Sequence, residues 1–165
     1  MKILVFSDSH SYLPFMRECV EAVSPACILH LGDYFADGET IARENPQVRF
    51  YQVPGNCDAF RCPTDEPEVL MPRIGGVNIF MTHGHLHRVK SHTALLLKDA
   101  RKKKADIVLY GHTHIAECVQ EPDGLWVMNP GSCGYFGTTA GLIEVENGKI
   151  LRCQILHSGD LEGVL

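Results

Sequence analysis

The chain has 165 residues, of which 45% are hydrophobic and 21% are charged, the proportions of an ordinary globular protein. Its 15 basic and 20 acidic residues give a net charge of -5, which argues against a stable nucleic-acid partner held on a basic face. The seven cysteines include no Cys-x-x-Cys pair, so we expect free thiols in a reducing cytoplasm rather than a disulfide framework. No apolar run is long enough to span a membrane. We therefore expect one cytoplasmic domain over residues 1–165 without a membrane partner.

Short apolar runs followed by polar loops recur through the first two thirds of the chain. Runs this short, rich in Val, Ile, Phe and Tyr, are typical of buried strands. They predict strands at 3–6, 28–31, 48–53, 77–81 and 107–110. Apolar residues at helical spacing predict helices over 14–23, 37–44 and about 91–104, with Ser91 as the N-cap of the last.

The last third of the chain has a different pattern. After Gly111, predicted strands at 141–145 and 150–156 flank Asn147-Gly148, a strong signal for a type I′ turn. The basic run 101–104 is better explained as cations at a helix C-terminus than as a nucleic-acid contact. The proline-rich stretch 54–72 is predicted to be an extended loop. The chain thus combines βαβ crossovers with later antiparallel strands.

Each of the first five predicted strands leads into a loop that carries Asp, Asn or His. The carboxyl ends of parallel strands are where open α/β sheets bind their ligands. One such residue alone is more often a turn residue, a helix cap or a solvated histidine, but five such loops at one sheet edge indicate a functional site. The loops are Asp8-Ser9-His10, Gly32-Asp33, Pro54-Gly55-Asn56-Cys57-Asp58, His83-Gly84-His85 and Gly111-His112-Thr113-His114.

The candidate ligands offer nitrogen and oxygen donors and no thiolate. They are Asp8, His10, Asp33, Asn56, His83, His112 and His114. Such donors fit Mn, Fe, Zn, Ni or Co better than a structural zinc site, which prefers cysteine. Seven ligands are too many for one catalytic ion with open positions and suit two divalent ions that share a carboxylate. Two ions roughly 3.5–4 Å apart hold a bridging hydroxide and clamp the oxygens of an in-line displacement at phosphorus.

In these motifs and their order the sequence resembles the calcineurin-like metallophosphoesterase superfamily, over essentially the whole chain. It is most similar to the small, capless prokaryotic phosphodiesterases, a group that also includes the retromer scaffold subunit. Asn129-Pro130-Gly131-Ser132 looks like a segment of the smallest members. The resemblance implies an α/β fold, a four-layer α/β/β/α sandwich of two sheets flanked by helices.

The resemblance also implies an assignment of ligands and an activity. One ion would be held by Asp8, His10, Asp33 and His114. The other would be held by Asp33, Asn56, His83 and His112, so that Asp33 bridges the pair. Members of this kind hydrolyse small phosphodiesters, often with Mn²⁺, and Ni, Co, Fe and Zn are the alternatives that the donor set allows.

One departure from the family pattern concerns the proton donor. Many superfamily phosphatases have Gly-Asn-His-Glu, whereas this chain has Cys57-Asp58 after Asn56, and cysteine is a poor acid at neutral pH. We therefore expect His85 to protonate the leaving group, with orientation of a ligand as its alternative role. Asp58 is expected to orient a ligand or a water.

Two other functions share the same motifs. A phosphomonoesterase could use the same metal pair, and a scaffold of this fold would bind other proteins without catalysis. The intact set of ligands favours an enzyme, because a scaffold does not need to keep all seven. Self-association into a homo-oligomer is left open by the sequence.

Overall fold

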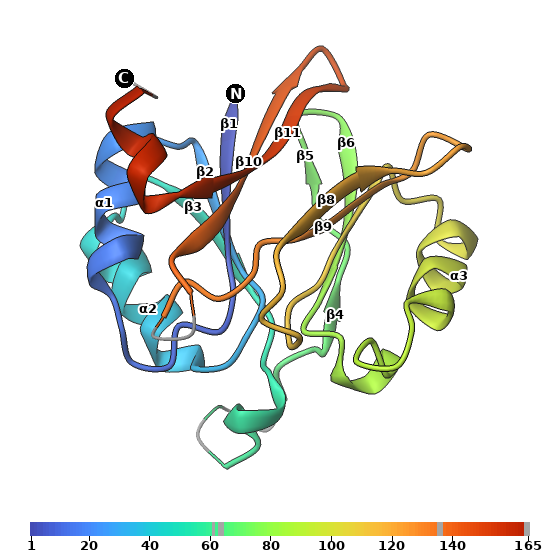
Figure 1. The fold of residues 1–165 in the computed structure, drawn as a ribbon, viewed down its shortest axis with the longest axis horizontal. Helices are drawn as coiled ribbons and strands as arrows, with labels where there is room; N and C mark the ends of the chain where they lie inside the picture. Colours follow the sequence, from blue (N-terminus) through green and yellow to red (C-terminus); the bar gives the residue numbers. More distant parts are fainter. Residues whose placement is uncertain (61, 63–64, 135–136, 164–165) are drawn as a thin grey trace.

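The computed structural model describes residues 1–60, 62, 65–134 and 137–163, and in these ranges two β-sheets face each other between outer helices (Figure 1). The predicted four-layer sandwich is confirmed. The first sheet has the strand order β11-β10-β1-β2-β3 and the second the order β4-β6-β7-β9-β8, with β5 paired to β6. The first sheet comprises β1 (Lys2–Phe6), β2 (Cys27–His30), β3 (Arg49–Gln52), β10 (Thr139–Glu146) and β11 (Lys149–His157). The second comprises β4 (Val69–Leu70), β5 (Arg73–Ile74), β6 (Val77–Thr82), β7 (Ile107–Leu109), β8 (Glu117–Gln120) and β9 (Trp126–Asn129).

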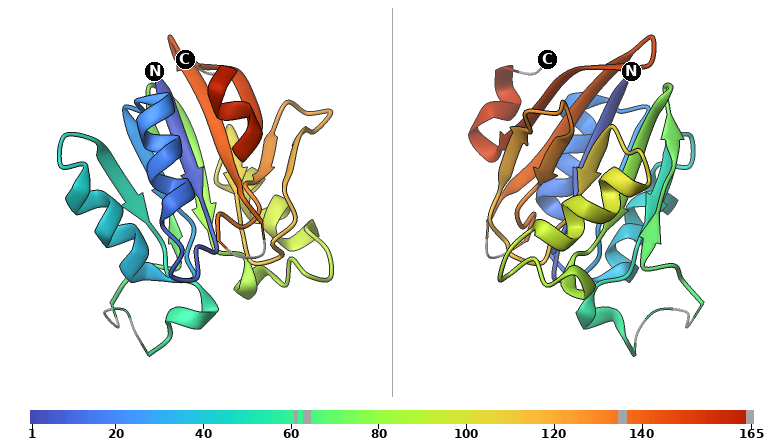
Figure 2. Two further views of the ribbon diagram at one scale, coloured as in Figure 1. Left: turned by 60° about the vertical axis from the view of Figure 1, so that its left-hand side comes forward. Right: turned by 90° about the vertical axis from the view of Figure 1, so that its right-hand side faces the viewer.

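The helices cover the outer faces of the two sheets (Figure 2). On the first sheet, α1 (Pro14–Val23) and α2 (Phe35–Glu44) connect the parallel strands β1, β2 and β3. On the second, α3 (Ala94–Lys102) connects the parallel strands β6 and β7. Because parallel strands of one sheet share a direction, the loops after β1, β2 and β3 emerge at one end of the first sheet, and those after β6 and β7 at one end of the second. The two sets of loops meet, since His112 N–H donates to Asp8 Oδ2 at 3.1 Å. Short 3-10 turns also occur, η1 (Asn56–Asp58), η2 (His85–His87) and η3 (Ser158–Gly163).

The hydrophobic core consists of three clusters, one between the two sheets and one between each sheet and its helices. Both faces of a sheet contribute because the side chains of a strand alternate between its two faces. On β1, Ile3 and Val5 belong to the cluster between the sheets, whereas Leu4 and Phe6 pack with Met16 of α1. A third cluster packs α3 against the outer face of the second sheet. Both faces of these central strands are buried, which is why they read as continuous apolar runs in the sequence.

Most predicted elements are confirmed, and the differences have local causes. The first helix spans Pro14–Val23 as predicted, and φ is positive at Asn147 and Gly148, as a type I′ turn requires. Ser91 as an N-cap is wrong, because its backbone N–H donates to the Arg88 carbonyl in a preceding turn and the helix begins at Ala94. The stretch 54–72 is not a loop throughout, since it contains η1 and β4; residues 61, 63 and 64 lie outside the described residues.

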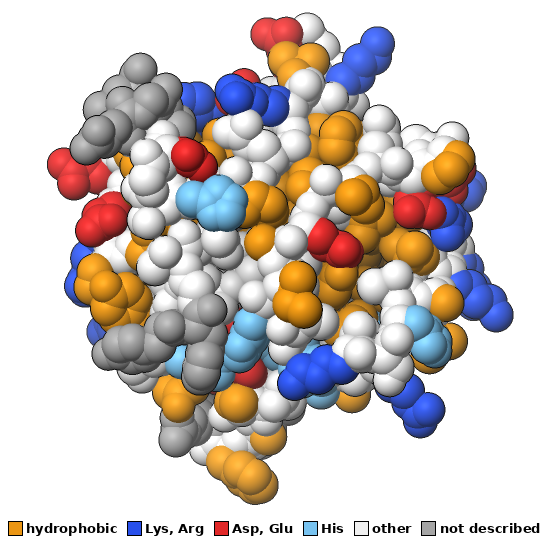
Figure 3. All heavy atoms as spheres, in the orientation of Figure 1, with side chains coloured by type: hydrophobic (Ala, Val, Ile, Leu, Met, Phe, Trp, Pro, Cys, Tyr) orange, Lys and Arg blue, Asp and Glu red, His pale blue; other side chains and the backbone are white. Residues whose placement is uncertain are grey.

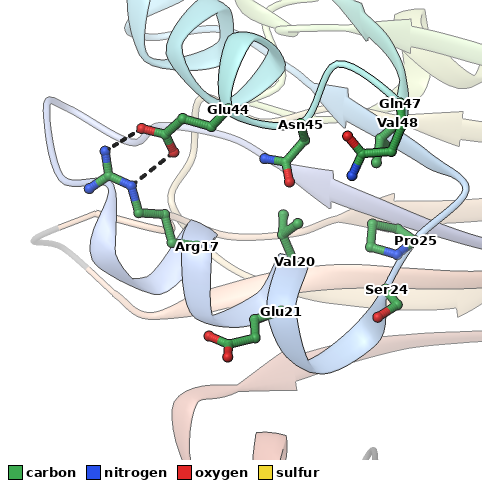
Figure 4. Close-up of a pocket in the computed structure, with 9 residues that line it drawn as sticks. All are labelled: Arg17, Val20, Glu21, Ser24, Pro25, Glu44, Asn45, Gln47 and Val48. Carbon is green, nitrogen blue, oxygen red and sulfur yellow. Dashed lines mark hydrogen bonds and ion pairs between the residues drawn. The ribbon is translucent and has the colours of Figure 1, made fainter.

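Surface ion pairs tie neighbouring elements together away from the ligand loops. In the groove between α1 and α2, Arg17 donates two hydrogen bonds, of 2.7 and 2.9 Å, to the Glu44 carboxylate (Figure 4). Arg101 at the end of α3 pairs with Asp123 at 2.7 Å and Glu121 at 3.1 Å. The first residue of the basic run thus meets acidic partners within the chain. Among the described residues, no helix has the length and apolar character needed to span a membrane.

Candidate metal centre

The loops at the carboxyl ends of the strands bring the predicted ligands together at one end of the sandwich, where histidine side chains reach the surface (Figure 3). Two groups of ligand atoms lie within 4.8 Å of one another, Asp8 with His10 and His114, and Asp8 with Asp33 and His83. The structure therefore places five of the seven predicted ligands in two adjoining clusters. Asp8 belongs to both clusters, whereas the family resemblance implied that it holds one ion only.

The first cluster is centred on the Asp8 carboxylate. His114 Nε2 lies 3.1 Å from Asp8 Oδ1, and His10 Nε2 lies 4.0 Å from the same oxygen. The rings of His10 and His114 meet edge to face with their centroids 5.4 Å apart. Three donors thus converge on one point, with Asp8 fully buried behind them.

The second cluster is centred on His83. Its Nε2 lies 3.5 Å from Asp33 Oδ2 and 3.1 Å from Asn56 Oδ1, which adds Asn56 to the cluster. Asp33 Oδ2 is also 3.9 Å from His10 Nε2, so the Asp33 carboxylate faces both clusters, as a shared ligand must. The ring of His112 lies beside that of His83, with centroids 5.0 Å apart.

The hydrogen bonds of His83 show that this cluster fits a cation. Its Nδ1 lies 2.8 Å from the Leu31 carbonyl, which can only accept, so Nδ1 carries the proton. With a divalent ion bound, the ring would be neutral and Nε2 would direct its lone pair to the ion, together with the carboxylate of Asp33 and the amide oxygen of Asn56. These three acceptors would then share the ion instead of repelling one another. The nitrogen and oxygen donors suit a first-row metal.

The backbone of the ligand loops adopts an uncommon conformation. Positive φ angles are rare for residues other than glycine and gather at functional sites. They occur at five of the predicted ligands, Asp8 (56°), His10 (46°), Asp33 (48°), His112 (69°) and His114 (61°). The fold maintains them through backbone hydrogen bonds between loops, including Asp8 N–H to the Gly32 carbonyl at 2.9 Å.

Two glycines are required where the loops cross. A Cβ on Gly55 would collide with the Asp33 carboxylate and its backbone nitrogen, and a Cβ on Gly111 would collide with Ser7 Oγ and Asp8 Oδ2. The loops can approach so closely only because neither residue has a side chain. The recurring glycines of the ligand motifs therefore position the ligands themselves.

Asp58 is a buried residue beside the second cluster whose carboxylate holds two ligand loops together, and we call it the clamp. Only 1% of its surface is exposed, and its carboxylate accepts hydrogen bonds from the N–H groups of Asp33 (3.0 Å), Phe35 (2.9 Å) and Gly55 (2.8 Å). Of the two roles expected for Asp58, this geometry fits the orientation of a ligand, Asp33, rather than of a water. The carboxylate joins the loop after β2 to the loop after β3.

Several residues that hold the ligands were not singled out by the sequence. Ser7 Oγ donates to Asp8 Oδ2 at 2.5 Å, and Ser132 Oγ donates to the Asp8 carbonyl at 2.8 Å. Asp37 in the first turn of α2 accepts from Ser9 Oγ and Ser11 N–H, at 2.6 and 2.8 Å. Of these residues, only Ser132 lies in a segment that was noted in the sequence, residues 129–132. Asp37 is distant in sequence from the serines that it contacts, and Ser7, although adjacent to Asp8, carries no motif that marks it as a support.

Asn129 from the same segment orients the loop between His112 and His114. Its Nδ2 donates to the Gly111 carbonyl at 3.1 Å and to Thr113 Oγ1 at 2.9 Å. Its Oδ1 accepts from Gly131 N–H at 2.9 Å. The amide is fully buried, so each of these bonds is made within the protein.

The environment of the clusters shifts the pKa values of the ligands. Burial, followed by the charges of His83 and Lys90, lowers the pKa of His112 to about 4, so the ring is neutral and ready to coordinate at pH 7. The hydrogen bond to Asp8 raises the pKa of His114. Burial works against ionisation of Asp8, but hydrogen bonding from His114 and the charge of His83 outweigh it and lower its pKa.

The two residues considered for proton transfer lie beside the second cluster. The ring centroid of His85 is 5.5 Å from that of His83 and 6.1 Å from that of His112, and its Nε2 is 3.8 Å from Glu68 Oε2. Burial and then the charge of His83 lower the pKa of His85. Cys57 contributes its backbone N–H, which donates to Asp33 Oδ1 at 2.9 Å. Although Cys57 is exposed at the surface, partial desolvation of its thiol and then the Asp33 carboxylate raise the pKa of the thiol to about 11, which makes it a weak acid.

His30 is a buried polar support behind the first cluster. Its Nδ1 accepts from Gly32 N–H at 3.2 Å and its Nε2 lies 3.3 Å from Ser9 Oγ. Complete burial lowers the pKa of His30 below its ordinary value of 6.5. As the pH falls below 6.5 the unfolded chain therefore binds a proton that the folded chain excludes, so acid favours unfolding.

We expect His30→Gln to weaken this acid sensitivity. The free energy of unfolding of the EDTA-treated wild type should fall with pH below 6.5, with His30 contributing up to about 1.4 kcal/mol per pH unit. His30→Gln removes that contribution, so its slope should be shallower. Urea unfolding at pH 7.5, 6.5, 5.5 and 5.0 measures both slopes. Parallel slopes would show that His30 takes up a proton freely in the folded state.

Comparison with known proteins agrees with this geometry. Residues 1–148 match the model of the calcineurin-like phosphoesterase superfamily domain. Phosphodiesterase MJ0936 of Methanocaldococcus jannaschii is 29% identical in an alignment 163 positions long, which covers 88% of this chain and 94% of that relative. A predicted phosphoesterase of Streptococcus pneumoniae has a TM-score of 0.73 at 25% identity, covering 94% of this chain and 88% of that one. Zinc-complexed Vps29 of Entamoeba histolytica has a TM-score of 0.73 at 22% identity, covering 94% and 98%, a likeness of fold alone. The chain belongs to the calcineurin-like phosphoesterase superfamily.

Proposed function

We propose that the chain is a metal-dependent phosphodiesterase that acts on a small phosphodiester with two divalent ions, Mn²⁺ foremost. The observation that carries the proposal is the pair of adjoining clusters, in which Asp33 faces His10 on one side and His83 on the other. The phosphodiesterase from M. jannaschii supports diesters as the substrate class. When bound, the two ions would supply Lewis-acid stabilisation and lower the pKa of water that attacks phosphorus.

The residues of the chain would bind the ions, orient the ligands, contact the phosphate and protonate the leaving group. Asp8, His10, Asp33 and His114 would hold one ion, and Asp33, Asn56, His83 and His112 the other. Asp58 would keep Asp33 in place through its three backbone hydrogen bonds. The exposed Lys90, whose charge acts to lower the pKa of both His112 and His114, is one cation that could contact a phosphate oxygen at this edge. His85, beside the second cluster, would protonate the leaving group.

A matrix of metals and substrates tests the proposal. The chelated protein is reloaded separately with Mn, Ni, Co, Zn or Mg and assayed with bis-p-nitrophenyl phosphate and with p-nitrophenyl phosphate. We expect hydrolysis that requires metal and favours the diester. Preference for the monoester would make the chain a phosphomonoesterase. Hydrolysis of neither substrate by the metal-loaded protein would overturn the enzymatic proposal and favour a protein-binding scaffold.

The role of His85 predicts a dependence on the leaving group. A nitrophenolate leaves without a proton, whereas an alkoxide needs one. We expect His85→Ala to lower kcat/KM by roughly 100-fold or more for an alkyl diester and by only a few fold for the nitrophenyl diester. His157→Ala, an exposed histidine on β11, is the matched control and should change neither rate. Equal losses on both substrates would instead assign His85 to orientation of the metal ligands.

A further inference from the structure

Two cysteines meet where the edges of the two sheets come together. Cys118 lies on β8 and Cys153 on β11, and their Sγ atoms are 3.2 Å apart although 35 positions separate them in sequence. β8 and β11 are the terminal strands of their sheets. Both side chains are partly buried and pack against the cluster between the sheets. The contact therefore bridges the sandwich at its edge.

We propose that Cys118 and Cys153 form a reversible disulfide that joins the two sheets. The oxidant is a low-molecular-weight disulfide of the glutathione class. The thiolate of one cysteine attacks it and forms a mixed disulfide, releasing the first glutathione thiol. The second cysteine then attacks the mixed disulfide and releases the other. Two cysteine thiols are oxidised, one glutathione disulfide is reduced to two thiols, and the two cysteine protons end on these products.

The surroundings of the pair favour this reaction over reactions of the other buried cysteines. The sulfurs need to approach by only about 1.2 Å to reach the bonding distance of about 2.05 Å. The hydrogen bond between the two sulfurs lowers the pKa of Cys118 and so favours its thiolate, which makes Cys118 the attacking group. By contrast, burial raises the pKa of Cys19 to about 12 and that of Cys27 to about 11.

The cross-link has a stability consequence. It would close a loop between two edge strands and so restrict the unfolded chain, which raises the melting temperature of the oxidised protein. β8 begins three residues after His114, so the link would also anchor the chain that leaves the last ligand loop. Neither effect requires the metal ions.

The test uses the full-length chain equilibrated in buffers of reduced and oxidised glutathione, trapped with N-ethylmaleimide and mapped by peptide mass spectrometry. We expect a Cys118–Cys153 peptide, a mass loss of about 2 Da and a melting temperature several degrees above that of the reduced protein, all reversed by dithiothreitol. Cys57→Ser, at an exposed cysteine, is the matched control and should retain the cross-link and the shift. Cys153→Ser should lose both.

Peptide mapping of the wild type decides the question even if Cys153→Ser folds poorly. Full alkylation of Cys118 and Cys153 in the most oxidising buffer would overturn the proposal. Stable glutathione adducts on either cysteine, or pairing of either with Cys57 or Cys62, would overturn it as well.

Discussion

Asp33→Asn is expected to reduce metal-dependent diester hydrolysis by roughly a thousandfold or more. The substitution keeps the shape of the side chain but removes the negative charge that faces both clusters. One oxygen must also give way to an amide nitrogen, which cannot bind a cation. Because Asp33 Oδ2 lies within 3.9 Å of His10 Nε2 and 3.5 Å of His83 Nε2, both ions would lose a ligand. Steady-state kinetics with bis-p-nitrophenyl phosphate under saturating Mn²⁺ measures the loss.

Metal content separates this effect from misfolding. We expect Asp33→Asn to retain fewer ions per chain than the wild type after dialysis, by elemental analysis, while its circular dichroism spectrum is unchanged. Asp123→Asn removes an exposed carboxylate that pairs with Arg101, and it should match the wild type in activity and in metal content. Full activity of Asp33→Asn would contradict a shared-carboxylate metal centre.

Asp58→Ala should destabilise the fold by roughly 3–5 kcal/mol, the largest stability effect that we expect at the site. The change leaves three buried backbone N–H groups, those of Asp33, Phe35 and Gly55, without their acceptor. Asp58→Asn keeps one acceptor oxygen and should lose less. Urea unfolding of the EDTA-treated variants measures both free energies.

The same substitution should also weaken metal binding, because the Asp33 loop loses its anchor. Exposed Asp123→Ala is the control for removal of a carboxylate and, because it breaks only a surface ion pair and one turn hydrogen bond, should stay within about 1 kcal/mol of the wild type. A loss below 1 kcal/mol for Asp58→Ala would mean that water replaces its hydrogen bonds, and the clamp would then have no energetic role.

The strands, the helices and the positions of the ligand loops follow from local patterns, whereas the four-layer sandwich and the division of the ligands between two ions were implied by the family resemblance. The apolar run 3–6 and the helix 14–23 are recognisable from their own residues, and the ligand motifs stand directly after the strands. Asp37 was not predicted as a support, because its hydrogen-bond partners Ser9 and Ser11 become its neighbours only through the fold. The Ser91 error has a similar origin, since a turn beginning at Arg88 takes the serine out of the capping position.

The contact between Cys118 and Cys153 could not be predicted from the local sequence around either cysteine. Each cysteine lies in an apolar-patterned strand, and nothing in either segment indicates the other. Their meeting depends on the strand order of two sheets and on the way those sheets face each other. The sequence therefore supported only the expectation of unpaired thiols.

The left-handed backbone of the ligand loops bears on the order of folding and metal uptake. In many small zinc domains the ion supplies the folding free energy, so removing it unfolds the chain. Here the loops after β1 and β2 are held to each other by protein hydrogen bonds, including Asp8 N–H to the Gly32 carbonyl and Ser9 N–H to the Asp33 carbonyl. A chain built in this way would fold first and take up its ions afterwards. Its metal occupancy would then follow the supply of ions around it, and a chelator would inactivate it without unfolding it.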